Sequence, residues 1–135
     1  MKGTKKSSKK QVARDDVIFL IARLFLVSVF VFSLFGKLTN FSGNSAFIGA
    51  SGFPFPEVLL LVAILLELVG VVSLVLGYKT MLGAKALVVF TVLATLMFHI
   101  GAGEEVALLK NLGLIGGLLL LMVTGPGKYS LDHKN

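Results

Sequence analysis

Four long apolar runs, separated by short polar segments, dominate the hydropathy pattern of this chain. They cover about residues 17–36, 58–77, 81–100 and 106–125. Each run has the ~20 residues that a helix needs to cross the ~30 Å hydrocarbon core of a bilayer. None alternates apolar and polar residues as the strands of a membrane barrel do, and backbone groups inside a bilayer must bond internally. The pattern therefore predicts an all-α polytopic membrane protein, a four-transmembrane-helix bundle.

The composition agrees with a membrane protein and excludes several cofactor classes. Of the 135 residues, 56% are hydrophobic and 15% are charged, whereas soluble domains have roughly 45–50% apolar and about 25% charged residues. The chain has no cysteine, which excludes thiol relays, Cys-held zinc and iron–sulfur clusters within it. His99 is the only histidine in an apolar run, so a bis-histidine haem site within one chain is not expected. We expect no cofactor that the chain holds by itself, except a bound quinone, which is considered below.

The segments outside the runs are expected to be tails. Residues 1–16 form a basic cytoplasmic tail, residues 17–125 the transmembrane domain, and residues 126–135 a cytoplasmic C-terminal tail. A secretory signal is the alternative for the first run, but this run is long, contains Arg23 and lacks a small-residue cleavage site. The basic tail has no aromatic or base-reading residues, so it predicts contact with anionic membrane lipid and no nucleic-acid partner.

The distribution of basic residues predicts the orientation of the four spans. With both termini in the cytoplasm, ten of the thirteen Lys and Arg residues lie on the cytoplasmic side. Lys37 and Lys110 then lie outside, and Arg23 lies within the first span. Cytoplasmic loops carry the excess of Lys and Arg in membrane proteins. We therefore expect a multi-pass protein of the bacterial inner membrane with both termini cytoplasmic.

Two charged residues are predicted deep in the apolar runs. Charged groups at this depth are rare and mark functional sites by default. Arg23 would lie roughly 9 Å and Glu67 roughly 15 Å from the cytoplasmic edge at ~1.5 Å per helical residue. A guanidinium can cross this difference and offer a carboxylate a two-pronged hydrogen bond. We predict a buried Arg23–Glu67 pair, with Lys37 as the second-choice partner of Glu67.

A second group of polar residues is expected at the outer ends of the spans. Together they form a candidate polar ligand pocket beneath the connection at residues 40–57, and they are Lys37, His99, Lys110 and Asn111. The alternative for the lysines is that they reach the lipid headgroups from the helix ends. The set contains no spacing typical of metal ligands, so no metal site is predicted.

Several stretches resemble the DoxX family when taken in order. They are "ARLFLVSVFVFSLFGKLTNF", "GFPFP", "LLELVGVVSLVLGYKTMLGA" and "KNLGLIGGLLLLMVTGPGKYSLD". The resemblance covers about residues 22–132, and the closing Gly-Pro-Gly-Lys-Tyr-Ser-Leu-Asp is its most specific part. Many members of the family have a glycine where this chain has Val27-Ser28-Val29, so packing at that point differs. By position, the polar residues of the family correspond to Arg23, Lys37, Glu67, Lys110 and Asn111.

The resemblance implies a four-helix inner-membrane protein associated with quinone-linked redox or oxidative-stress chemistry. In that function, Lys37, His99, Lys110 and Asn111 would hydrogen-bond a quinone, and electrons would come from a redox partner subunit or a soluble donor. The alternative is a non-enzymatic membrane scaffold or lipid-handling protein, alone or as a homo-oligomer, whose buried charges fix helix packing. A transporter is less favoured, because no pair of Gly/Pro-broken helices marks a midplane site. A shared fold does not decide between these functions, and whether the chain is an enzyme stays open.

Overall fold

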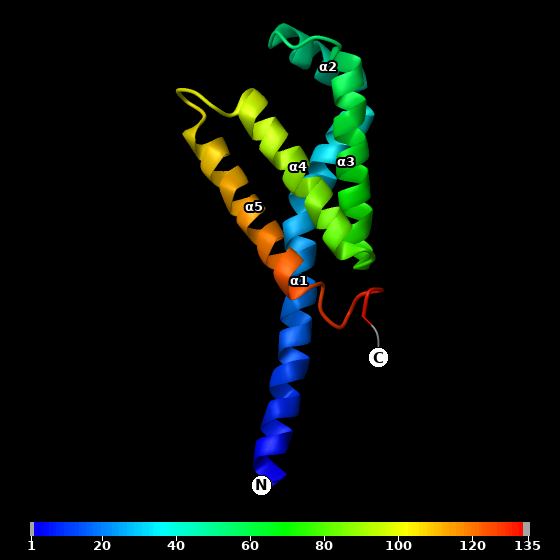
Figure 1. Cartoon of the computed structure of the whole chain (residues 1–135), viewed down its shortest axis with the longest axis vertical. Coiled ribbons are helices and arrows are strands. Elements are labelled where there is room, and N and C mark those ends of the chain that lie inside the picture. The colour runs from blue at the N-terminus through cyan, green and yellow to red at the C-terminus, as the bar shows by residue number, and fades with distance from the viewer. Residues whose placement is uncertain (1, 134–135) are drawn as a thin grey trace.

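The computed structural model describes residues 2–133 and contains five helices (Figure 1). In chain order they are α1 (Lys2–Thr39), α2 (Phe41–Ala50), α3 (Pro56–Leu76), α4 (Thr80–Phe98) and α5 (Glu105–Thr124). No strand occurs in this part of the chain. All but α2 are long and apolar enough to cross a membrane. The predicted fold class, an all-α bundle with four membrane spans, is confirmed.

The first helix is longer than the apolar run that predicts it. It has 38 residues, or about 57 Å at 1.5 Å per residue. Its N-terminal part projects from the bundle as a continuation of the span (Figure 1). No glycine or proline occurs from Thr4 to Phe35, and Lys, Arg, Gln and Ala favour helix. The expected basic tail therefore continues the first helix, and Met1, Lys134 and Asn135 of the two expected tails lie outside the described residues.

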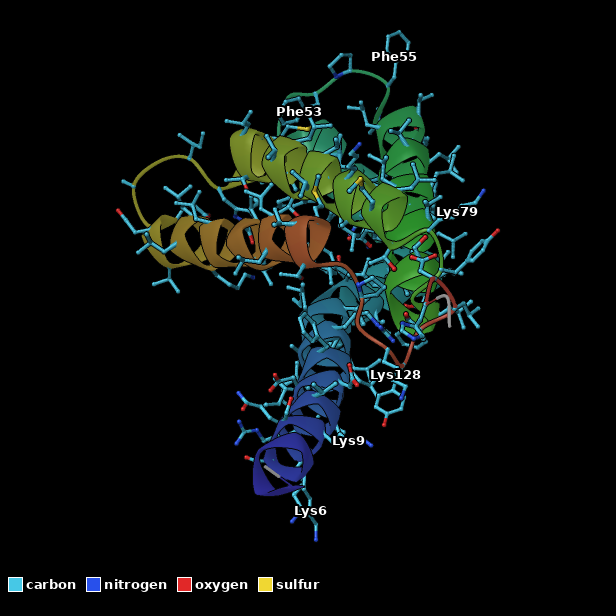
Figure 2. All side chains as sticks on the ribbon, turned by 60° about the horizontal axis from the view of Figure 1, so that its bottom comes forward. Lys6, Lys9, Phe53, Phe55, Lys79 and Lys128 are labelled. Carbon is cyan, nitrogen blue, oxygen red and sulfur yellow. The ribbon has the colours of Figure 1, made fainter. Side chains whose placement is uncertain are left out.

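The four long helices run antiparallel in chain order and define two ends of the bundle. We call the end with the α3–α4 connection, residues 77–79, the turn end, and the opposite end the α2 end. Figure 2 shows Phe53 and Phe55 at the α2 end, whereas Lys79 and Lys128 lie toward the turn end. Within residues 2–133, both terminal parts of the chain leave the bundle at the turn end. An even number of spans places them together.

The helix α2 lies within the expected connection at residues 40–57. Its first turn is capped by Asn40, whose side-chain oxygen accepts a hydrogen bond from the Gly43 N–H at 3.2 Å. Two of its residues, Ser45 and Ile48, are buried, and the helix packs on α3 and α1. Pro56 then begins α3 at the position where a proline costs no intrahelical hydrogen bond.

Small residues bring α3 and α4 together near the turn end. A Cβ on Gly70 would collide with Leu87, and a Cβ on Gly83 would collide with Ser73. The main apolar core lies in the same half of the bundle and comprises Val27, Phe30, Leu74, Ala84, Leu87, Leu118 and Leu121. The helix α5 packs mainly on α4 and only lightly on α1. The bundle is therefore tight at the turn end, and a second, smaller apolar cluster, made of Leu34, Ile48, Leu60 and Ile64, lies toward the α2 end.

Candidate functional site

Glu67 lies near the middle of α3 and is completely buried. Its Oε1 accepts hydrogen bonds from Lys37 Nζ at 3.0 Å and from Ser33 Oγ at 2.7 Å. Lys37 also donates to Ser33 Oγ at 2.6 Å, and its ammonium lies 4.9 Å from the centre of the Phe90 ring. Three charged or polar side chains from α1 and α3 thus form one partly buried cluster.

The predicted Arg23–Glu67 pair is wrong, and Lys37, the second-choice partner, takes the place of Arg23. The physical reason is the direction of side chains on a helix. The Cα–Cβ bond leans toward the helix N-terminus. Arg23 therefore extends toward the turn end, away from Glu67, while Lys37 extends back from the α2 end toward it. The axial distance between Arg23 and Glu67 is within reach of an arginine side chain, but the Arg23 side chain points the wrong way along the helix.

Arg23 instead binds the backbone of the C-terminal segment. Only 2% of its surface is exposed, and its two terminal nitrogens donate to the carbonyl oxygens of Pro126 at 2.6 Å and Tyr129 at 2.8 Å. Its Nε has no partner among the described residues. This charge therefore has a structural role at the turn end.

The same C-terminal segment caps both helices of the α3–α4 turn. The N–H groups of Leu131 and Asp132 donate to the carbonyls of Leu76 and Gly77 at 3.1 and 2.8 Å. The Asp132 carboxylate accepts from the N–H groups of Lys79 and Thr80 at 2.7 and 2.8 Å. The helix α4 has no side-chain cap of its own, so Asp132 supplies one from a distant part of the sequence.

The surroundings of Asp132 change its acidity. Partial desolvation raises the pKa of the Asp132 carboxyl, but the hydrogen bonds from Thr80 and Lys79, with the nearby Arg23 charge, lower it by more. The net result is a pKa below the ordinary value. The carboxylate is therefore the form that holds the turn.

All four predicted pocket residues line one cavity at the α2 end. Lys37, His99, Lys110 and Asn111 border a volume of about 320 Å³ to which α1, α2, α3, α4 and α5 all contribute. Ligand sites have volumes of ~300–1,000 Å³ with mostly apolar walls and a few placed polar groups. The cavity matches this description in volume and lining. Arg23 is not part of its lining.

The polar groups of the cavity have unequal numbers of protein partners. Asn111 donates one amide N–H to Thr95 Oγ1 at 2.9 Å, and His99 Nδ1 lies 2.9 Å from Glu104 Oε2. Lys37 has three N–H donors, of which Glu67 and Ser33 take two. Lys110 forms no ion pair within residues 6–133. The cavity therefore offers hydrogen-bond donors and one cation that the described part of the protein does not neutralise.

Besides Asn44 of α2, which lines the cavity, sequence reasoning missed four polar residues of this region. Ser33 and Thr91 line the cavity, and Thr95 and Glu104 bind two of its polar groups. The helical period contains a signal for the first three, since Ser33 lies four residues before Lys37 and Thr91 four residues before Thr95. Glu104 lies in the α4–α5 connection, and no periodicity marks it.

Aromatic rings close the cavity toward the α2 end. Phe47 of α2 packs on Phe98 of α4 with ring centres 5.3 Å apart, and Phe53 packs on the same ring at 5.5 Å. On the opposite side, Phe30 and Phe90 meet edge to face at 6.4 Å. The helix α2 therefore covers the site with apolar side chains.

These features define a class of protein: a small helical membrane protein with four spans and a donor-rich cavity between them. Residues 18–100 match the DoxX family. The chain belongs to the DoxX family. It is 36% identical over 122 residues to the inner membrane protein YqjF of Escherichia coli (strain K12), covering 88% of this chain and 92% of YqjF.

A second relative agrees with the first. The inner membrane protein YphA of Escherichia coli (strain K12) is 30% identical over 130 residues, covering 90% of this chain and 93% of YphA. No solved structure matches the chain significantly. Taken with the four apolar spans, these relatives identify the chain as a DoxX-family inner membrane protein.

Proposed function

We propose that the protein is a small membrane subunit that binds a quinone in the cavity at the α2 end and serves quinone-linked redox or oxidative-stress chemistry. The observation that carries this proposal is the lining of the cavity. Apolar and aromatic walls adjoin hydrogen-bond donors and Lys110, a cation that forms no ion pair with any described residue. A quinone presents carbonyl oxygens, which accept hydrogen bonds, on an apolar ring.

The roles of the polar residues follow from the hydrogen-bond donors that they do not use within the described part of the protein. Lys110 and the second amide N–H of Asn111 are donors for one quinone carbonyl, and the third N–H of Lys37 is a donor beside the Phe90 ring. A positive charge near a quinone oxygen favours its reduced, more negative forms. The chain has no cysteine for an iron–sulfur centre, so electrons would come from a redox partner subunit or a soluble donor.

The test is the quinone content of the purified protein. The double variant Lys110→Leu, Asn111→Leu loses the hydrogen-bond donors for the quinone head. We expect quinone to co-purify with the unmodified protein and not with this variant. Mass spectrometry after gentle solubilisation measures the quinone, and thermal unfolding shows whether the variant is folded. Lys85→Leu is the matched control, because Lys85 is an exposed lysine of α4 outside the cavity lining. Unchanged quinone content in the folded double variant would reject the proposal.

A membrane scaffold or lipid-handling protein is the second candidate, and one observation favours it. Both deeply buried charges are used within the protein, since Glu67 pairs with Lys37 and Arg23 binds carbonyls of the C-terminal segment. Charges used in this way fix the relative positions of helices. The scaffold would become the better description if the purified protein held no quinone and still formed a stable complex with another protein.

A further inference from the structure

The cavity has different chemistry at its two sides. Its polar side chains from α1 and α5, among them Ser33, Lys37 and Asn111, border one side. Its border on α3 is apolar throughout, and its border on α4 is apolar apart from Thr91 and the C-cap residue His99; Val62, Leu66, Leu93 and Met97 are among the apolar residues. A ligand that fills this volume therefore has a polar part and an apolar part that point in different directions.

The apolar side of the cavity lies where the helices α3 and α4 diverge. The two helices are in closest contact near the turn end, at Gly70 with Leu87 and at Gly83 with Ser73. Figure 1 shows them separating from their shared turn toward the α2 end. The separation leaves a gap between two membrane spans beside the cavity. Both spans contribute residues to the cavity lining there, namely Val62 of α3 and Leu93 of α4.

Four residues of the cavity lining are exposed, and they are Phe47 of α2, Val62 of α3, Leu93 of α4 and Lys110 of α5. Val62 and Leu93 both line the cavity, and each has 47% of its surface exposed. Both lie inside membrane spans, Pro56–Leu76 and Thr80–Phe98. The surface that they expose therefore faces the lipid chains. The aromatic contacts of Phe98 with Phe47 and Phe53 cover the cavity toward the α2 end.

We propose that the cavity opens sideways into the bilayer between α3 and α4, and that its ligand is a long-chain lipid-soluble molecule. The oxygen-bearing head lies at Lys37 and Asn111, and the apolar chain leaves between Val62 and Leu93. This inference rests on the proposed function in so far as the head is a quinone. It adds the route of access, from the hydrocarbon region of the membrane, and the requirement for a chain.

The absence of cysteine from the chain allows a direct test. Val62→Cys introduces a single thiol at the mouth, which a bulky methanethiosulfonate reagent modifies and a reductant restores. The protein in lipid vesicles is offered a long-chain or a short-chain ubiquinone, is isolated again, and its bound quinone is measured by mass spectrometry. We expect modification to cause loss of the long-chain quinone, reduction to restore it, and the short-chain quinone to bind in both states.

The control is Leu65→Cys, because Leu65 is an exposed residue of α3 that does not line the cavity. Its modification is expected to change neither quinone. Retention of the long-chain quinone by the modified Val62→Cys protein would overturn the lateral opening. Equal loss of both quinones would overturn the placement of the chain, since the mouth would then border the head.

A second measurement separates this inference from the proposed function. If the unmodified protein binds neither quinone, the proposed function fails, but the opening can still be observed with lipid alone. The chain has no tryptophan, so Phe90→Trp places a single tryptophan on the cavity wall, which is excited selectively over the two tyrosines. If the mouth is open, brominated phosphatidylcholine in the vesicles should quench the fluorescence of this tryptophan. Modification of the Val62→Cys thiol in the same protein should then reduce the quenching. Absence of quenching, or quenching unaffected by the modification, would reject the opening.

Discussion

At the scale of single residues, the buried charges of this protein have two kinds of partner. Glu67 is paired with a cation, Lys37, while Arg23 is held by neutral carbonyls of Pro126 and Tyr129. A buried ion pair gains little net stability because both charges lose water, but removal of one member strands the other. Lys37 also lines the cavity. The same side chain therefore holds α1 to α3 and borders the candidate ligand site.

The Lys37–Glu67 pair predicts strong coupling between two substitutions. Glu67→Leu alone strands the Lys37 charge, and Lys37→Met alone strands the carboxylate; each should cost roughly 3–5 kcal/mol, as for broken buried pairs in soluble proteins. The double variant should cost much less than the sum of the two. Thermal or denaturant unfolding in detergent measures the four proteins of this cycle.

The matched control is a second double-mutant cycle, in which Arg23 and Glu67 are substituted instead of Lys37 and Glu67. Because Arg23 makes no contact with Glu67 and binds the C-terminal segment instead, Arg23→Met and Glu67→Leu should have additive effects. Additive losses for Lys37 and Glu67, with coupling for Arg23 and Glu67, would show that the observed pairing is incorrect.

At the scale of the elements, the C-terminal segment explains why the end of the chain has such a specific sequence. Arg23 holds its start, and Leu131 and Asp132 bind the end of α3 and the beginning of α4. Gly77 at this turn has φ +64, and a Cβ there would collide with Ser130. Glycine is thus required both by the backbone conformation and by the approach of the segment.

Asp132 predicts an acid-sensitive cap on α4. Its pKa is lowered in the folded protein, so its contribution is complete above the unfolded pKa of about 3.9 and is lost as the pH falls through the lower folded value. Asp132→Asn keeps one acceptor oxygen but loses the charge and the second acceptor, and should cost about 1 kcal/mol, as for a lost helix cap. Hydrogen exchange at Lys79 and Thr80 should accelerate in this variant at neutral pH.

The control for this prediction is Asp15→Asn. Asp15 is exposed and its contact with Arg14 is a surface pair at 4.0 Å, so its loss should leave exchange at the α3–α4 turn unchanged. Equal exchange at Lys79 and Thr80 in the Asp132→Asn variant and the unmodified protein would show that the carboxylate does not cap the helix.

The sequence predicts the helices that the bilayer stabilises better than it predicts the helix that depends on packing. The ranges 58–77, 81–100 and 106–125 end within two residues of α3, α4 and α5, because the apolar runs that define them are also what a bilayer stabilises. Such boundaries vary by one or two residues in any case. The helix α2 was not predicted, since "FSGNSAFIGA" is a poor helix former, and its packing on α3 and α1 stabilises it.

The candidate site was predictable to a similar degree. Lys37, His99, Lys110 and Asn111 converge because each lies at the same end of its span, and antiparallel spans bring these ends together. The partner of Glu67 was not predictable from depth along the helices alone, because the direction of the Cα–Cβ bond decides between Arg23 and Lys37. The closure by Phe47 and Phe98 depends on α2 and was missed with it.

At the scale of the whole molecule, the arrangement of charges predicts its orientation in the membrane. The projecting part of α1, the α3–α4 turn and the C-terminal segment all lie at the turn end (Figure 1). Lys79 and Lys128 are at this end as well (Figure 2). Basic residues are retained on the cytoplasmic side of the inner membrane. The turn end should therefore be cytoplasmic, and the cavity at the α2 end should lie in the outer half of the bilayer.

Reporter fusions test this orientation. A reporter that is active only in the cytoplasm should be active when fused after Asn135, and inactive when inserted after Ala102 in the α4–α5 connection at the α2 end. A reporter that is active only in the periplasm should give the opposite result at both positions. Because the four spans fix the two sites on opposite sides of the membrane, a periplasmic signal at Asn135 together with a cytoplasmic one at Ala102 would mean an inverted protein. The cavity would then lie in the inner half of the bilayer, and a quinone bound there would exchange protons with the cytoplasm.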